Sequence, residues 1–89
     1  MPQPDRPMKT LTATILTADA CLYDGPAAAA FLPGSVSPFE VLPGHAPLIS
    51  VLEPGAVRLV LDGKDAFSVR IRSGVARVSG DKVTVCVEI

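Results

Sequence analysis

Alternating apolar and polar positions in the second half of the chain predict short β-strands separated by turns. In the segment 67–72, apolar residues occupy the odd positions and polar residues the even ones, as in a half-buried strand. In 83–89, every odd position is valine or isoleucine. Asp62-Gly63 follows an apolar run and indicates a hairpin. Further breaks are predicted at Ser73-Gly74 and at 79–81.

The first half is less regular. Threonines alternate with apolar residues over 11–15, which predicts a strand. Since 8–24 contains neither proline nor glycine, a helix stays possible, although the threonine density favours a strand. Asp24-Gly25-Pro26 predicts a turn. The alanines of 27–30 favour a helix locally, but the segment between Pro26 and Pro33 is too short to sustain one.

The central stretch, 39–55, combines apolar residues with three prolines and two glycines. Pro43-Gly44 and Pro54-Gly55 predict sharp turns, and 33–38 is a turn-rich loop. The apolar residues of the stretch are expected to contribute to the core. They are Phe39, Val41, Leu42, Leu48, Ile49, Val51 and Leu52.

This pattern predicts an all-β protein, a small antiparallel β-sandwich or flattened barrel of about ten short strands. The sandwich domain is expected to span 9–89. Residues 1–8 are expected to form a flexible amino-terminal tail, because prolines remove backbone donors.

Composition narrows the class of protein. A chain of 89 residues is one small domain, which buries only about 60% of its unfolded surface and benefits from a partner. Hydrophobic residues make up 48% and charged residues 19%, which excludes disorder. The net charge of −1, without a basic stripe, argues against nucleic-acid binding. The amino terminus is not a signal peptide, and no apolar run reaches the roughly 20 residues of a membrane span, so direct bilayer insertion is not expected.

The chain offers little material for catalysis or metal binding. His45 is the only histidine, and Cys21 and Cys86 are the only cysteines. These fall short of a four-ligand zinc site, and no phosphate-binding loop occurs, so neither metal nor cofactor is expected. The cysteines could be two reduced thiols or a disulfide. A hydrolase using either thiol with His45 is a weak alternative, because no third group to orient the base is identifiable.

The nine residues Leu-Pro-Gly-His-Ala-Pro-Leu-Ile-Ser at 42–50, followed by Leu52, Pro54-Gly55 and Val57-Arg58, resemble the signature of the epsilon subunit of F-type ATP synthases. The resemblance covers the amino-terminal sandwich domain from about Leu11 to Ile89. It implies a non-catalytic rotor subunit that packs on the gamma subunit and the c-ring. Such a subunit couples ion-driven rotation to ATP synthesis as a peripheral part of the complex on the cytoplasmic face of the inner membrane. It also implies a strand over the alanines.

The resemblance also assigns contact residues. The positions expected to face the c-ring are Ser35, Val36, Ser37, Pro38, Leu42 and His45. Those expected to face gamma are Thr17, Ala46, Leu48, Ile49 and Ser50.

The chain departs from the family in two ways. The acidic, glycine-rich loop before the signature has Val36 and Pro38 at its acidic positions, and Glu40 replaces its last glycine. Charge pairing with the c-ring loop through those positions is therefore in doubt, and Glu40 faces either a partner or water. Many relatives also continue into two inhibitory helices, whereas this sequence stops at Ile89, either as a short subunit or as a truncated one. These residues are therefore expected to support coupling without nucleotide-sensitive inhibition.

The rival hypothesis is an isolated β-sandwich module that binds a peptide or a small ligand. It requires an exposed groove with convergent polar groups or aromatics. Aromatic residues make up 4% of the chain and tryptophan is absent, which weakens a carbohydrate-type platform. For a rotor subunit, apolar surface around Ala46, Leu48 and Ile49 is expected to be exposed in the isolated domain.

Overall fold

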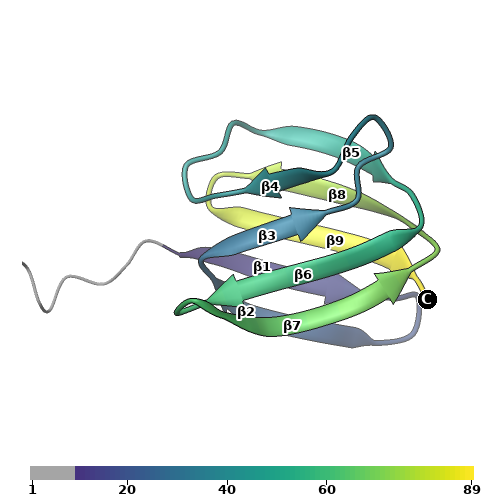
Figure 1. The fold of residues 1–89 in the computed structure, drawn as a ribbon, viewed down its shortest axis with the longest axis horizontal. Helices are drawn as coiled ribbons and strands as arrows, with labels where there is room; N and C mark the ends of the chain where they lie inside the picture. Colours follow the sequence, from purple (N-terminus) through teal and green to yellow (C-terminus); the bar gives the residue numbers. More distant parts are fainter. Residues whose placement is uncertain (1–9) are drawn as a thin grey trace, which may run out of the picture.

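A computed structural model describes residues 10–89, which contain nine β-strands and no helix (Figure 1). The predicted tail, 1–8, lies outside the described residues. The strands are β1 (Leu11–Leu16), β2 (Cys21–Ala27), β3 (Ala29–Leu32), β4 (Phe39–Val41), β5 (Leu48–Leu52), β6 (Gly55–Leu61), β7 (Lys64–Ile71), β8 (Ser73–Ser79) and β9 (Lys82–Glu88).

The strands form two open sheets that pack face to face, which confirms the predicted β-sandwich. One sheet has the order β2-β1-β9-β8-β5 and the other β4-β3-β6-β7. In Figure 1 the four-stranded sheet lies in front of the five-stranded one. All neighbouring strands are antiparallel except β1 and β9, which pair in parallel. The first and last strands therefore lie side by side in the centre of the larger sheet.

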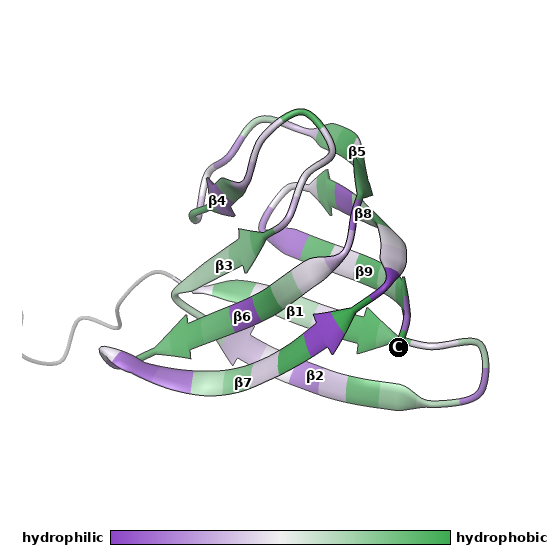
Figure 2. Cartoon of the chain, turned by 45° about the vertical axis from the view of Figure 1, so that its right-hand side comes forward, coloured by the Kyte–Doolittle hydropathy of each residue, from purple (hydrophilic) through white to green (hydrophobic). Residues whose placement is uncertain are grey.

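The core lies between the sheets and is apolar throughout. Within residues 10–89, no polar or charged residue is classed as buried. Alternate residues of each strand point inward, as the period of two requires. The largest inward side chains are Leu11, Ile15, Leu32, Val41, Leu52, Val57, Leu59, Val78, Val83 and Val85. The hydropathy-coloured ribbon in Figure 2 shows the resulting alternation along β9.

The predicted turn at Asp24-Gly25-Pro26 is wrong, because all three residues lie inside β2. β2 is an edge strand of its sheet, and an edge position tolerates proline, which needs no ladder partner for its missing N–H. The ring of Tyr23 lies next to Gly25 on the same strand. The Tyr23 hydroxyl then donates a hydrogen bond of 2.7 Å to the carbonyl oxygen of Pro26.

The alanine segment forms strand rather than helix, as the family resemblance implied. β2 ends at Ala27, and β3 begins at Ala29 in the other sheet, so the chain passes between the layers at Ala28. Ala27, Ala29 and Ala30 are buried. Methyl side chains allow the backbone to cross between the sheets without displacing the larger core residues.

The predicted hairpin turns are confirmed by left-handed backbone conformations. Asp62 and Gly63 have φ of 56° and 75°, the pattern of a type I′ turn. Gly44 has φ of 83° and Gly80 has φ of 60°. At Ser73-Gly74 the prediction was wrong, because both residues belong to β8 and the interruption falls at Arg72.

Three apolar residues that were available for the core are exposed, and at Ile49 this agrees with the exposed apolar surface expected of a rotor subunit. Leu42, Ile49 and Val51 point outward, whereas Val41 and Leu52 are buried and Phe39 and Leu48 pack partly against the core. In β5 the pleat sends successive residues to opposite faces, so only half of its apolar residues can point inward. Ile89 is also exposed, because it follows the end of β9.

Candidate interaction surface

Five residues with apolar or thiol side chains form one row across the outer face of the five-stranded sheet. We call this row the outer rung. The strand registers align Val51 with Val75, Val75 with Cys86, Cys86 with Leu16, and Leu16 with Cys21. The members come from β5, β8, β9, β1 and β2, so the row spans the whole sheet.

Exposure distinguishes the outer rung from an ordinary sheet surface. The outer face of an antiparallel sandwich is normally polar, yet Val51 remains 61% exposed and Val75 46% exposed. A shallow hollow of about 510 Å³ lies over the rung, and Leu16, Thr17 and Cys86 also line it. Large exposed apolar side chains that adjoin one another are typical of a protein-contact surface.

A second exposed region follows the free edge of β5. The β3–β4 loop is hydrogen-bonded to β5 and to the residue that follows it. Ser35 N–H donates to the Val51 carbonyl oxygen at 3.0 Å, and Glu53 N–H donates to the Pro33 carbonyl oxygen at 2.9 Å. These bonds cover part of an otherwise open strand edge. They also hold the loop against the outer rung, since Val51 belongs to both.

The β4–β5 turn lies next to the same loop. Val36, Ser37 and His45 line a hollow of about 320 Å³ together with Leu48, Ile49 and Ser50. At its rim Val36 is 99% exposed and Ile49 is 73% exposed.

The β4–β5 turn is held by specific hydrogen bonds. His45 N–H donates to the Leu42 carbonyl oxygen at 3.1 Å. The His45 Nδ1 lies 2.7 Å from the Ala46 carbonyl oxygen. From the β8–β9 turn, the Asp81 carboxylate accepts a hydrogen bond of 2.9 Å from Gly44 N–H.

Replacing Asp81 with alanine is expected to loosen the β4–β5 turn without unfolding the domain. The substitution removes one hydrogen bond, which we expect to lower the free energy of unfolding by about 1 kcal/mol. Amide hydrogen exchange at Gly44 should accelerate, because its N–H loses its acceptor. Asp19→Ala is the control, since no hydrogen bond is recorded for the exposed Asp19 carboxylate. Unchanged exchange at Gly44 would show that Asp81 does not hold the turn.

Comparison with known proteins identifies the family. The family model described as "ATP synthase, Delta/Epsilon chain, beta-sandwich domain" matches residues 10–89. The chain belongs to this family. It is 36% identical over 78 residues to the ATP synthase epsilon chain of Synechococcus elongatus. This alignment covers 88% of this chain and 56% of the relative. It is also 36% identical over 76 residues to ATP synthase epsilon chain 2 of Ralstonia nicotianae, and that alignment covers 85% of this chain and 55% of the relative.

The chain thus spans about half the length of these epsilon chains. Two solved structures share its fold. A chain of the Euglena gracilis mitochondrial ATP synthase (OSCP/F1/c-ring) superposes with a TM-score of 0.81 at 22% identity, covering 97% of this chain and 56% of that one. A chain of the Tetrahymena thermophila mitochondrial ATP synthase (central stalk/c-ring) gives 0.75 at 11% identity, covering 91% and 65%. The epsilon chain is a non-catalytic part of the synthase, in agreement with the non-enzymatic role expected from the sequence.

The structure groups the residues that the epsilon resemblance assigned to contacts, while their roles stay predictions. Four of the c-ring positions (Ser35, Val36, Ser37 and Pro38) occupy the β3–β4 loop, and Leu42 and His45 occupy the β4–β5 turn. The positions expected to face gamma fall into two places in the fold. Ala46 lies in the β4–β5 connection, and Leu48, Ile49 and Ser50 in β5, whereas Thr17 follows β1.

Thr17 lies apart from the other gamma positions but not apart from the surface. It lines the hollow over the outer rung together with Val51 and Val75. Its hydroxyl is already engaged, because Oγ1 accepts hydrogen bonds from the N–H groups of Asp19 and Ala20. Sequence reasoning missed Leu16, Val75 and Cys86, which strand register alone aligns with Val51.

The chemical alternatives find no support in the described part of the chain. The cysteines are both free, and β1 separates their strands, which puts their Cα atoms about 10 Å apart, too far for a disulfide. Cys21 Sγ donates to the Tyr23 carbonyl oxygen, and no hydrogen bond joins either thiol to His45. Over residues 10–89, no group of three or more His, Cys, Asp or Glu side chains could hold a metal ion, and no helix is suited to crossing a membrane.

Proposed function

We propose that this chain is the β-sandwich domain of an epsilon-type rotor subunit, which packs on the gamma subunit through the outer rung and on the c-ring through the β3–β4 loop and the β4–β5 turn. In this role it transmits ion-driven rotation to ATP synthesis as a mechanical adaptor. The complex would be peripheral, on the cytoplasmic face of the membrane. The outer rung is the observation that carries the proposal, because adjoining apolar side chains that stay exposed on a sheet face are typical of a protein-contact surface.

The gamma contact is argued from burial. Val51, Val75 and Ile49 leave apolar area in water, and covering it is worth about 25 cal/mol for each Å² removed. Arg77 lies beside Ile49 on the neighbouring strand and is exposed, which supplies a charge at the rim of the apolar row. An apolar centre with a polar rim is the usual arrangement of a protein interface.

The c-ring contact is argued from the exposed tips. Val36 and Leu42 project from the β3–β4 loop and the β4–β5 turn, respectively, and both are large apolar residues in water. Because apolar Val36 and Pro38 stand where relatives carry acids, contact with the c-ring would be mainly apolar at this loop. Glu40 is exposed on β4, and the Asp81 carboxylate lies at the β4–β5 turn, where it accepts the hydrogen bond from Gly44 N–H.

Co-expression with the gamma subunit from the same source tests the proposal. Analytical size exclusion is expected to give a one-to-one complex that contains this chain. Circular dichroism of the free chain provides the control for folding. Separate elution of a folded chain would contradict the gamma contact and favour an independent β-sandwich module.

A further inference from the structure

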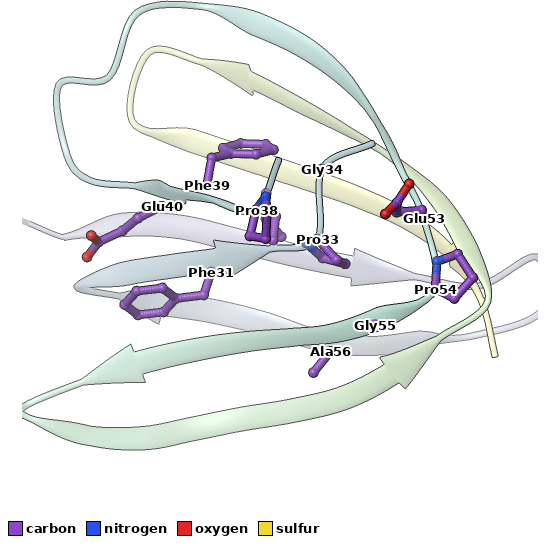
Figure 3. A pocket seen from close by; sticks show the side chains of 11 residues that line it. Phe31, Pro33, Gly34, Pro38, Phe39, Glu40, Glu53, Pro54, Gly55 and Ala56 are labelled. Carbon is purple, nitrogen blue, oxygen red and sulfur yellow. The ribbon is translucent and has the colours of Figure 1, made fainter. Parts of the chain in front are cut away.

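A groove of about 520 Å³ lies at the end of the four-stranded sheet where β3 passes into the β3–β4 loop. It lies between the β3–β4 loop and the start of β6, and none of its lining residues belongs to the outer rung. Figure 3 shows the side chains that line it. Its apolar surface comes from two phenylalanines and three prolines, namely Phe31, Phe39, Pro33, Pro38 and Pro54.

Two glycines fix the shape of the groove. A Cβ atom on Gly34 would lie 2.8 Å from the Phe39 ring, and one on Gly55 would lie 2.8 Å from Cβ of Pro33. Both distances are too short for real contacts, so these walls approach each other only because the two residues lack side chains. The hydrogen bond from Glu53 N–H to the Pro33 carbonyl oxygen adds a further tie across the groove. The groove is therefore already formed in the free domain.

The charge of the groove is entirely negative. Glu40 and Glu53 are its only ionisable lining residues, and both are exposed. Glu40 lies beside Phe31 at one end of the groove, and Glu53 lies beside Pro54 at the other (Figure 3). Among the described residues, the one recorded ion pair joins Arg58 to Asp65, so neither groove carboxylate has a cationic partner.

Two arginines adjoin the groove: Arg70 is exposed and aligned with the lining residue Ala56, whereas Arg58 is already engaged. Arg58 pairs with Phe31 across β3 and β6, and its guanidinium lies 4.3 Å from the centre of the Phe31 ring. The same guanidinium donates a hydrogen bond of 2.9 Å to Asp65. Arg58 therefore covers the ring and is held away from Glu40, and it demonstrates that the Phe31 ring accepts a guanidinium.

We propose that this groove binds an extended segment of a partner protein, with apolar residues or prolines in the middle and an arginine or lysine at each end. The aromatic and proline surface matches the apolar part, because the stems of long basic side chains and proline rings pack well on such surfaces. The separated carboxylates match the two cations. The site uses none of the outer rung, so it is separate from the proposed gamma contact, although Pro38 and the β3–β4 loop also belong to the proposed c-ring contact.

A synthetic peptide provides the test. The probe is Arg-Val-Pro-Leu-Pro-Val-Arg with blocked ends, and matched peptides carry glutamine or glutamate in place of both arginines. In a ¹⁵N-resolved NMR titration, the dibasic probe is expected to shift the amide signals of Phe31, Glu40 and Gly55 and to leave that of Val75 unchanged. The glutamine peptide should bind more weakly and the glutamate peptide weakest.

Variants of the folded chain separate charge recognition from apolar adsorption. Glu40→Gln and Glu53→Gln should each weaken the dibasic probe about threefold, and added salt should weaken it further. Asp19→Asn is the control, because Asp19 is exposed and lies in the β1–β2 loop, and it should leave the affinity unchanged. Equal binding of the three peptides, shifts confined to the outer rung, or no shifts at all would overturn the proposal. So would sedimentation showing a dimer of this chain that occupies the groove.

Discussion

Replacing Val75 with aspartate is expected to weaken the complex with the gamma subunit by about a hundredfold. Val75 lies inside the outer rung, between Val51 and Cys86. A carboxylate there would be buried against an apolar partner without a counter-ion, which is costly. In the free domain the same side chain is 46% exposed, so the carboxylate reaches water and the fold should survive. Titration calorimetry with purified gamma subunit measures the change.

Ser68→Asp is the matched control for this substitution. Ser68 is an exposed strand residue on the outer face of the other sheet, aligned with Arg58, so the added charge is the same but the surface differs. Its affinity for gamma should equal that of the unmodified chain. If the folded Val75→Asp chain also kept full affinity, the outer rung would not be the gamma contact.

Replacing Leu59 with alanine is expected to lower the free energy of unfolding by about 3 kcal/mol. Leu59 is fully buried and lies at the inner face of β6, between Ala30 of β3 and Phe67 of β7. The alanine at position 30 cannot expand to fill the space that the substitution leaves. For a domain of this size the change corresponds to a fall in melting temperature of about 15 °C, measured by thermal denaturation.

Val60→Ala provides the comparison, because Val60 follows Leu59 but points to the outer face, where it is only half-buried. Val60→Ala also removes methyl groups, but from a half-buried outer position. It should therefore lower the free energy of unfolding by less than about 1 kcal/mol. Equal losses for the two variants would contradict the assignment of Leu59 to the inner face. A large loss at Leu59 alone would also show that the domain has little stability to spare.

The two proposed surfaces have different chemistry. The outer rung is apolar with an arginine at its rim, whereas the groove on the other sheet combines aromatic and proline surface with two carboxylates. The substitutions Val75→Asp and Glu40→Gln therefore probe separate contacts, and additive effects are expected if the sites are independent.

The local sequence was sufficient to predict turns where a single residue determines the backbone conformation. Glycines at positive φ end strands because other residues are strained there, so Gly44, Gly63 and Gly80 mark true turns. Alternation along β7 and β9 correctly identified the inward positions, since a strand with one buried face has a period of two. The family was also recognisable, because the signature at 42–50 is a continuous stretch.

The errors arose where the outcome depends on a strand's neighbours. Asp24-Gly25-Pro26 reads as a turn by itself, but β2 lies at a sheet edge, where proline interrupts no ladder. Val51 reads as a core residue because it is apolar, yet the pleat of β5 directs it outward. Which of its two faces a strand of apolar residues buries is decided by the sheet that it joins.

The sequence by itself determined the β-sandwich class, most of the turns and the epsilon-type family, because each rests on residues that are close together in the chain. Only the tertiary structure decided the two candidate surfaces. The outer rung joins five strands from Leu16 to Cys86 through pairing registers, and the groove sets Glu40 and Glu53 at opposite ends of a shared apolar surface. Such sets are produced by strand order and register, which depend on long-range packing and leave no periodic trace in any single segment.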